Sequence, residues 1–253
     1  LNYKEKPNFK SLNKRWDALY LQILGTVHTG APVVILTVIT KNLMLVSVYT
    51  IFNIVMAGIN GILSIFISGL SASFGDVIAR EETTILQKSY KEFEFAYYAL
   101  ITFVYSVASI TIMSFIRIYT SGVTDISYVL PLIGFLFVIN GLVYNIKTPQ
   151  GMLVISAGLY KETKVQTTTQ GLIAIIVGGF LAIKYGIIGV LIGSILSNIY
   201  RDIDLMFFIP KNVTKLPVKN TAIRILRMFF TIVIIYIPFL FYKITPISYL
   251  TWV

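Results

Sequence analysis

Long apolar segments alternate with short polar ones along nearly the whole chain. About 20 consecutive apolar residues are enough for a helix to cross a bilayer, and seven segments approach or exceed this length. They are 18–40, 43–73, 95–116, 128–147 or further, 165–183, 186–208 and 222–242. The final stretch, "TPISYLTWV", looks like the approach to an eighth. The pattern predicts an all-α fold, a polytopic transmembrane helix bundle with about seven spans.

The polar connections divide the chain into four parts. We expect a basic segment at 1–17, six transmembrane spans at 18–208, a loop at 209–221, and a seventh span with the truncated start of another at 222–253. The chain opens on "LNYKEKPNFK", without an initiator Met or a signal-peptide pattern. We therefore expect a fragment.

Composition strengthens the membrane assignment. Hydrophobic residues make up 56% of the 253 residues and charged residues 13%, and the mean hydropathy is +0.80. A soluble domain carries roughly 25% charged residues. The composition therefore indicates an integral membrane protein.

The basic residues gather on one side of the predicted membrane. All but four of the 21 Lys and Arg fall in the N-terminal segment, in alternate loops or at the nearer ends of the spans, and the exceptions are Lys41, Arg117, Lys184 and Lys243. Such a bias predicts that this N-terminus is cytoplasmic in a multi-pass membrane protein. It explains the net charge of +10 without nucleic acid, and it predicts attraction to anionic lipids.

The acidic residues, by contrast, all fall outside the apolar cores of the predicted spans. They are Glu5, Asp17, Asp76, Glu81, Glu82, Glu92, Glu94, Asp125, Glu162, Asp202 and Asp204. Transporters that couple to protons or sodium through a membrane carboxylate need such a group at depth. The sequence predicts that this chain has none.

Little in the chain suggests catalysis. It has no Cys, a single His, and no Gly-rich nucleotide-binding loop. We expect no catalytic residues, no metal site and no cofactor, and thus no enzyme.

One ionisable residue is expected near the middle of the first span. His28 lies ten residues into it, about 15 Å deep by helix rise, and Pro32 would free its carbonyl and favour a kink. A histidine at this depth either bonds a neighbouring helix or lines a cavity. Both alternatives stay open.

The second span carries a polar and small stripe. Its members, which stay within about 80° of one another on a helix, are Asn53, Ala57, Asn60, Ser64, Ser68 and Ser71. Small residues at this spacing allow close helix packing. Two asparagines favour a face that lines a hydrated cavity.

A lysine and a proline interrupt the fourth apolar run at "GLVYNIKTPQGMLVISAG". Asn140, Tyr144, Lys147 and Gly151 share one helical face, within about 60°, whereas Asn145 lies off it. Lys147 either extends to the cytoplasmic interface at the end of the span, or faces an inward cavity on a helix that continues, broken at Thr148 and Pro149, to Lys161.

Two further patterns concern helix packing and a helix start. Gly189, Gly193 and Ser197 form a ridge suited to tight contact between helices. The stretch "TTTQG" at 167–171 fits either a helix cap or the mouth of a cavity.

Two long stretches carry a family resemblance. They are "SVYTIFNIVMAGINGILSIFISGLSASFGDVIARE" and "ISAGLYKETKVQTTTQGLIAIIVGGFLAIKYGIIGVLIGSILS". Both are similar to bacterial polysaccharide-repeat-unit flippases of the Wzx type, which produce O-antigen and capsule, within the multidrug/oligosaccharidyl-lipid/polysaccharide transporter superfamily. The resemblance covers nearly all of the chain and implies the C-terminal half of a transporter: a six-helix transmembrane lobe at 18–208 followed by an accessory helix, with the N-terminal half missing.

The resemblance implies a function and a mechanism. Such proteins have two six-helix lobes that open alternately to each side and move a lipid-linked oligosaccharide from the inner to the outer leaflet. A cationic cavity suits the diphosphate of that substrate. The expected substrate-binding residues are Lys147, His28, Asn60, Asn53, Asn140 and Asn145. Expected partners are the missing lobe and, further, a polysaccharide polymerase and glycosyltransferases.

Two other functions fit the same pattern. One is an antiporter of drugs or cations from the same superfamily, and the other is a non-transporting membrane scaffold that recruits polysaccharide-assembly enzymes through its basic loops.

Overall fold

The computed structural model describes residues 10–124 and 126–241, and within them the regular structure is entirely helical. The helices are α1 (Lys10–Ile35), α2 (Leu43–Ala79), α3 (Thr83–Tyr119), α4 (Pro131–Ile146), α5 (Thr148–Ser156), α6 (Lys164–Tyr185), α7 (Ile187–Ile209) and α8 (Val218–Phe241). Short π-helical segments, η1 (Leu36–Thr40) and η2 (Pro210–Thr214), extend α1 and α7. The predicted all-α helix bundle is confirmed.

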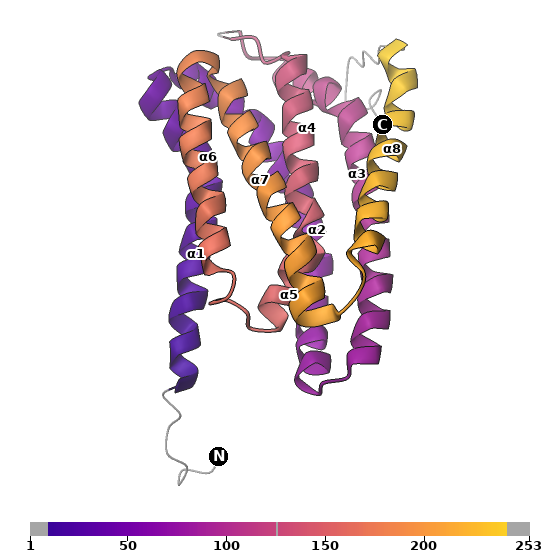
Figure 1. Ribbon diagram of the computed structural model, residues 1–253. Coiled ribbons are helices and arrows are strands. Elements are labelled where there is room, and N and C mark those ends of the chain that lie inside the picture. The colour runs from indigo at the N-terminus through magenta and orange to yellow at the C-terminus, as the bar shows by residue number, and fades with distance from the viewer. Residues whose placement is uncertain (1–9, 125, 242–253) are drawn as a thin grey trace.

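The long helices run side by side and alternate in direction (Figure 1). The start of α1, the α2–α3 turn, the α5–α6 connection and the α7–α8 connection lie at one end, drawn at the bottom of the view. Most of the basic loop residues belong to these connections, so we call this end the basic end. The η1–α2, α3–α4 and α6–α7 connections lie at the opposite end.

Six helices in the described part of the chain are long and apolar enough to cross a membrane. One of them is the combined segment Pro131–Ser156, which contains both α4 and α5. The protein is therefore a multi-pass membrane protein. Helix α7, also predicted as a span, is not among the six, and Arg201, Asp202 and Asp204 lie in its second half.

The predicted helix positions agree with the structure, while several ends differ. Helix α3 begins at Thr83 rather than near residue 95, and α2 continues to Ala79 rather than ending near 73. Both extensions carry polar residues beyond the apolar run, where hydropathy gives no signal. The stretch proposed as the approach to an eighth span lies outside the described residues.

Helices α6 and α7 make the closest backbone contact in the described bundle. A side chain added at Gly193 would overlap the backbone of Gly178, and one added at Gly189 would overlap the carbonyl of Leu181. Gly186 allows the turn between the two helices with a φ of 53°, a conformation that favours glycine. The predicted packing role of the small-residue ridge on α7 is confirmed.

The junction of α4 and α5 is a helix break with a local cause. Pro149 has no N–H to bond the carbonyl of Asn145, and the backbone N–H of Lys147 bonds that carbonyl instead. The carbonyl of Ile146 accepts a hydrogen bond from the hydroxyl of Tyr98, 3.1 Å away. The chain resumes as α5 at Thr148 and ends its helix at Ser156, so the predicted continuation is present but stops before Lys161.

Candidate functional site: a polar cavity at a helix break

A cavity of about 350 Å³ lies among α1, α2, α4 and α7. Four of the six predicted binding residues line it: His28, Asn53, Asn60 and Asn140. Ser194 and Asn198 contribute further polar groups from α7. The structure thus gathers residues that are 170 positions apart in the sequence at one concave surface, which we call the central cavity.

A second cavity, of about 160 Å³, adjoins the first and brings in α6. His28 and Tyr144 line both spaces, and Lys147, Thr167 and Gln170 line the second. We call it the lysine cavity. Together the two cavities contain every predicted binding residue except Asn145.

Lys147 points into the protein at the break between α4 and α5. Its Nζ donates to Oδ1 of Asn198 at 2.7 Å and to the carbonyl of Tyr144 at 3.1 Å. The ammonium also lies over the Tyr144 ring, 4.5 Å from the centroid, a cation–π geometry. These contacts favour the broken-helix alternative over a lysine that extends to the interface.

Asn198 is the centre of the polar contacts around this lysine. Its Oδ1 also accepts from Nε2 of Gln170 at 3.2 Å, and its Nδ2 donates to Oδ1 of Asn140 at 3.2 Å. We call Asn140, Lys147, Gln170 and Asn198 the Lys147 cluster. It joins α4, α6 and α7 at the wall shared by the two cavities.

His28 faces the same space without a protein partner on one side of its ring. Its Nδ1 is buried and forms no hydrogen bond. A buried polar atom without a partner costs roughly 1–3 kcal/mol. Because His28 lines both cavities, the cavity-lining alternative describes its position.

Asn145 differs from the other predicted residues because it is buried, with 3% of its surface exposed. Its Nδ2 donates to Asn60 Oδ1 at 2.8 Å and to the Tyr105 hydroxyl at 2.8 Å, and Tyr97 donates to its Oδ1 at 2.9 Å. Its amide nitrogen and its amide oxygen thus both have partners inside the protein. Asn145 orients Asn60 toward the central cavity and does not line the cavity itself.

The expectation that no carboxylate is enclosed by the bundle is wrong at two positions. Asp202, one turn after Asn198 on α7, lies close enough to Lys147 for each charge to act on the other. The two side chains form no ion pair, and Oδ1 of Asp202 is buried without a hydrogen-bond partner. Asp202 therefore offsets part of the positive charge at the helix break.

The second enclosed carboxylate is Glu94, which is 2% exposed. Its Oε1 accepts from Tyr90 at 3.1 Å, Gln150 at 3.2 Å and Thr221 at 2.8 Å, and its Oε2 pairs with Arg224. We call these five residues the Glu94 cluster. It ties α8 and α5 to α3, and the sequence could not reveal it because Thr221 and Arg224 are about 130 positions away.

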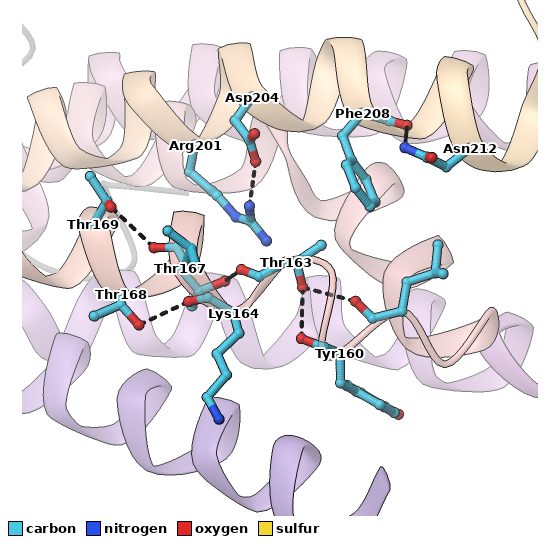
Figure 2. A network of polar contacts seen from close by, with 12 residues as sticks. Tyr160, Thr163, Lys164, Thr167, Thr168, Thr169, Arg201, Asp204, Phe208 and Asn212 are labelled. Carbon is cyan, nitrogen blue, oxygen red and sulfur yellow. Dashed lines mark hydrogen bonds and ion pairs between the residues drawn. The ribbon is translucent and has the colours of Figure 1, made fainter.

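Figure 2 shows a network of polar contacts near the start of α6 and in the second half of α7. The hydroxyls of Thr167, Thr168 and Thr169 bond carbonyls one turn earlier in the chain, so they are not helix caps, while Thr167 and Gln170 line the lysine cavity. Arg201 is buried and pairs with Asp204 on its own helix. Of the two alternatives for the "TTTQG" stretch, the structure therefore favours a cavity wall over a helix cap.

In the part of the chain that the structure describes, no group of three or more His, Cys, Asp or Glu side chains is arranged to hold a metal ion. Asn198, Gln170 and Tyr144 are the residues that sequence reasoning did not select. Asn198 was hidden beside a ridge of small residues that indicated packing alone, whereas Tyr144 was visible on the Lys147 face.

Comparison of the chain with models of known families, with curated proteins and with solved structures finds no match. The resemblance to polysaccharide flippases therefore remains a prediction from the sequence.

Proposed function

We propose that this chain is one helical lobe of a flippase that moves a lipid-linked oligosaccharide from the cytoplasmic to the outer leaflet of a bacterial inner membrane. The observation that carries the proposal is the position of Lys147. A cation held at a helix break, beside amides, borders the lysine cavity, which adjoins the central cavity within an apolar bundle. Broken helices at membrane depth often border transport sites.

The chemistry of the two cavities suits different parts of such a substrate. The ammonium of Lys147 attracts a diphosphate through charge-assisted hydrogen bonds. Asn53, Asn60 and Asn140 each offer an amide that both donates and accepts, as sugar hydroxyls require. In this proposal a second lobe closes the open side of the central cavity, and the basic end faces the cytoplasm.

An antiporter of drugs or cations is the second candidate, and Asp202 favours it. A buried carboxylate oxygen without a partner is a place where a proton or a cation can bind. The charge of Asp202 also reduces the net positive charge near Lys147, which weakens the attraction for an anion. The two candidates differ in the charge of the transported molecule.

The test is genetic complementation with the full-length protein that carries this chain, in a strain without its own flippase. We expect the wild type to restore surface polysaccharide, and the double variant Lys147→Ala, His28→Ala to lower export at least tenfold at equal abundance in the membrane, about the value of one charge-assisted hydrogen bond. Lys41→Ala, Lys184→Ala is the control, because it removes two lysines at the opposite end and should export normally.

Each other result excludes part of the proposal. Failure of the wild type to restore export would exclude the flippase and leave the antiporter or a scaffold for assembly enzymes. Full export by the Lys147, His28 variant would remove the site assignment but keep the transport function.

A further inference from the structure

A groove of about 540 Å³ runs between α3 and α8 on the outer surface of the bundle. The two helices lie side by side at the right of Figure 1. Apolar residues form much of the groove: Phe95 and Phe103 on α3, and Met228 and Ile235 on α8. The groove is separate from the two polar cavities, which are lined by other helices.

Two arginines lie in this groove, and no acidic residue lines it. Arg224 is held from behind by Glu94. Arg227, one turn further along α8, is exposed, and no ion pair involves it among the described residues. The groove therefore has an unbalanced positive charge.

The position of Arg227 on an apolar helix makes this charge costly in lipid. It lies nine residues after Val218, the first residue of α8, which is about 14 Å of helix rise. Its neighbours Leu226 and Phe230 on the same helix are 57% and 67% exposed, so this helix surface faces hydrocarbon. A guanidinium at such a position needs a counter-ion or a path to water.

We propose that the groove between α3 and α8 binds an anionic phospholipid of the leaflet at the basic end. The lipid phosphate bonds to Arg227 and to the N–H groups of Arg224 that Glu94 does not use, because a planar guanidinium matches phosphate oxygens in a fork geometry. One acyl chain lies along Phe103 and Ile235. Basic pockets between membrane helices are known to hold anionic lipid headgroups in this way.

This site goes beyond the proposed transport function and does not depend on it. A bound lipid here bridges α3 and α8 next to the Glu94 cluster, so it adds to the attachment of α8. A zwitterionic lipid has a phosphate but also a cationic ammonium group, which the two arginines repel. The site therefore distinguishes lipids by net charge.

The experiment is native mass spectrometry of the purified full-length protein titrated with phosphatidylglycerol or with phosphatidylcholine. We expect the wild type to retain phosphatidylglycerol in preference to phosphatidylcholine, and Arg227→Gln to weaken phosphatidylglycerol binding about tenfold, the factor for one charge-assisted hydrogen bond. Arg117→Gln is the matched control, because it removes one arginine from the opposite end of α3 and should change nothing.

A second variant tests the groove rather than the charge. Ala99 is exposed on the floor of the groove, and Ala99→Phe fills the space for an acyl chain while keeping both arginines. We expect it to weaken phosphatidylglycerol binding as well. Equal retention of the two lipids, or unchanged binding in Arg227→Gln, would overturn the proposal and indicate that Arg227 extends to water. Unchanged binding in Ala99→Phe would overturn the groove as the site.

Discussion

The Glu94 cluster and the Lys147 cluster are both buried polar groups in an apolar bundle, but they differ in how their central charge is held. Every oxygen of Glu94 has a partner, and Arg224 neutralises its charge. Lys147 forms hydrogen bonds but no ion pair among the described residues, and the nearby Asp202 and His28 each keep a buried polar atom without a partner, as Gln150 does in the Glu94 cluster. The Lys147 cluster and His28 line the two polar cavities, whereas the Glu94 cluster reaches only the outer groove, through Arg224.

This difference indicates that the Glu94 cluster attaches one helix to another, whereas the groups around Lys147 bind a ligand. Satisfied buried charges hold elements together, and their loss leaves an uncompensated charge. Unsatisfied buried atoms reduce stability unless a ligand or water completes them. We therefore expect the Glu94 cluster to respond to mutation mainly through stability, and the groups around Lys147 mainly through function.

The largest effect is expected for Glu94→Gln. It leaves Arg224 half-enclosed without a counter-charge, and we expect the free energy of unfolding to fall by about 3–5 kcal/mol. Thermal unfolding in detergent measures it. Asp76→Asn is the control, because the Arg80–Asp76 pair is exposed and should contribute less than about 1 kcal/mol. Equal losses in the two variants would contradict the attachment role.

A smaller effect is expected for Asn198→Leu in the Lys147 cluster. It removes the acceptor shared by Lys147 and Gln170, and we expect a loss of about 2 kcal/mol, measured in the same way. Asn198→Asp keeps that acceptor and adds a charge opposite to that of Lys147, so it should retain most of the stability. If Asn198→Leu were as stable as the wild type, the cluster would not hold α4, α6 and α7 together.

The smallest effect on stability is expected for His28→Leu. Because Nδ1 of His28 has no partner to lose, the free energy of unfolding should change by no more than about 0.5 kcal/mol. Export, measured by complementation, should nevertheless fall. A large loss of stability with normal export would reverse the distinction between the two groups and make His28 a packing residue.

Hydropathy predicted the positions of the helices because each span must be apolar to lie in lipid. It did not predict that α3 begins at Thr83, since that first part of the helix carries polar residues. The break before Pro149 was one of two alternatives from the sequence, because the missing N–H of proline acts locally.

The polar centres depended on contacts that no local pattern contains. From its position in the sequence, Glu94 was expected outside the membrane core. The structure shows that α8 packs against α3 and that Arg224 forms an ion pair with Glu94 there. Likewise Asn198 is one residue from a packing ridge, and its role follows from the rotation of α7 toward α4 and α6. The sequence predicted which helical faces carry Lys147 and Asn60, but it did not predict the residues that bond to them.

The contact between Gly178 and Gly193 has a mechanical consequence for the cavities. With no side chains between the two backbones, sliding α6 along α7 by a single residue would drive larger side chains into the opposing main chain. Helices α6 and α7 must therefore move as one rigid unit that carries Gln170 and Asn198 together. Any change in the width of the cavities has to come from α1, α2 or α4 moving relative to this helix pair.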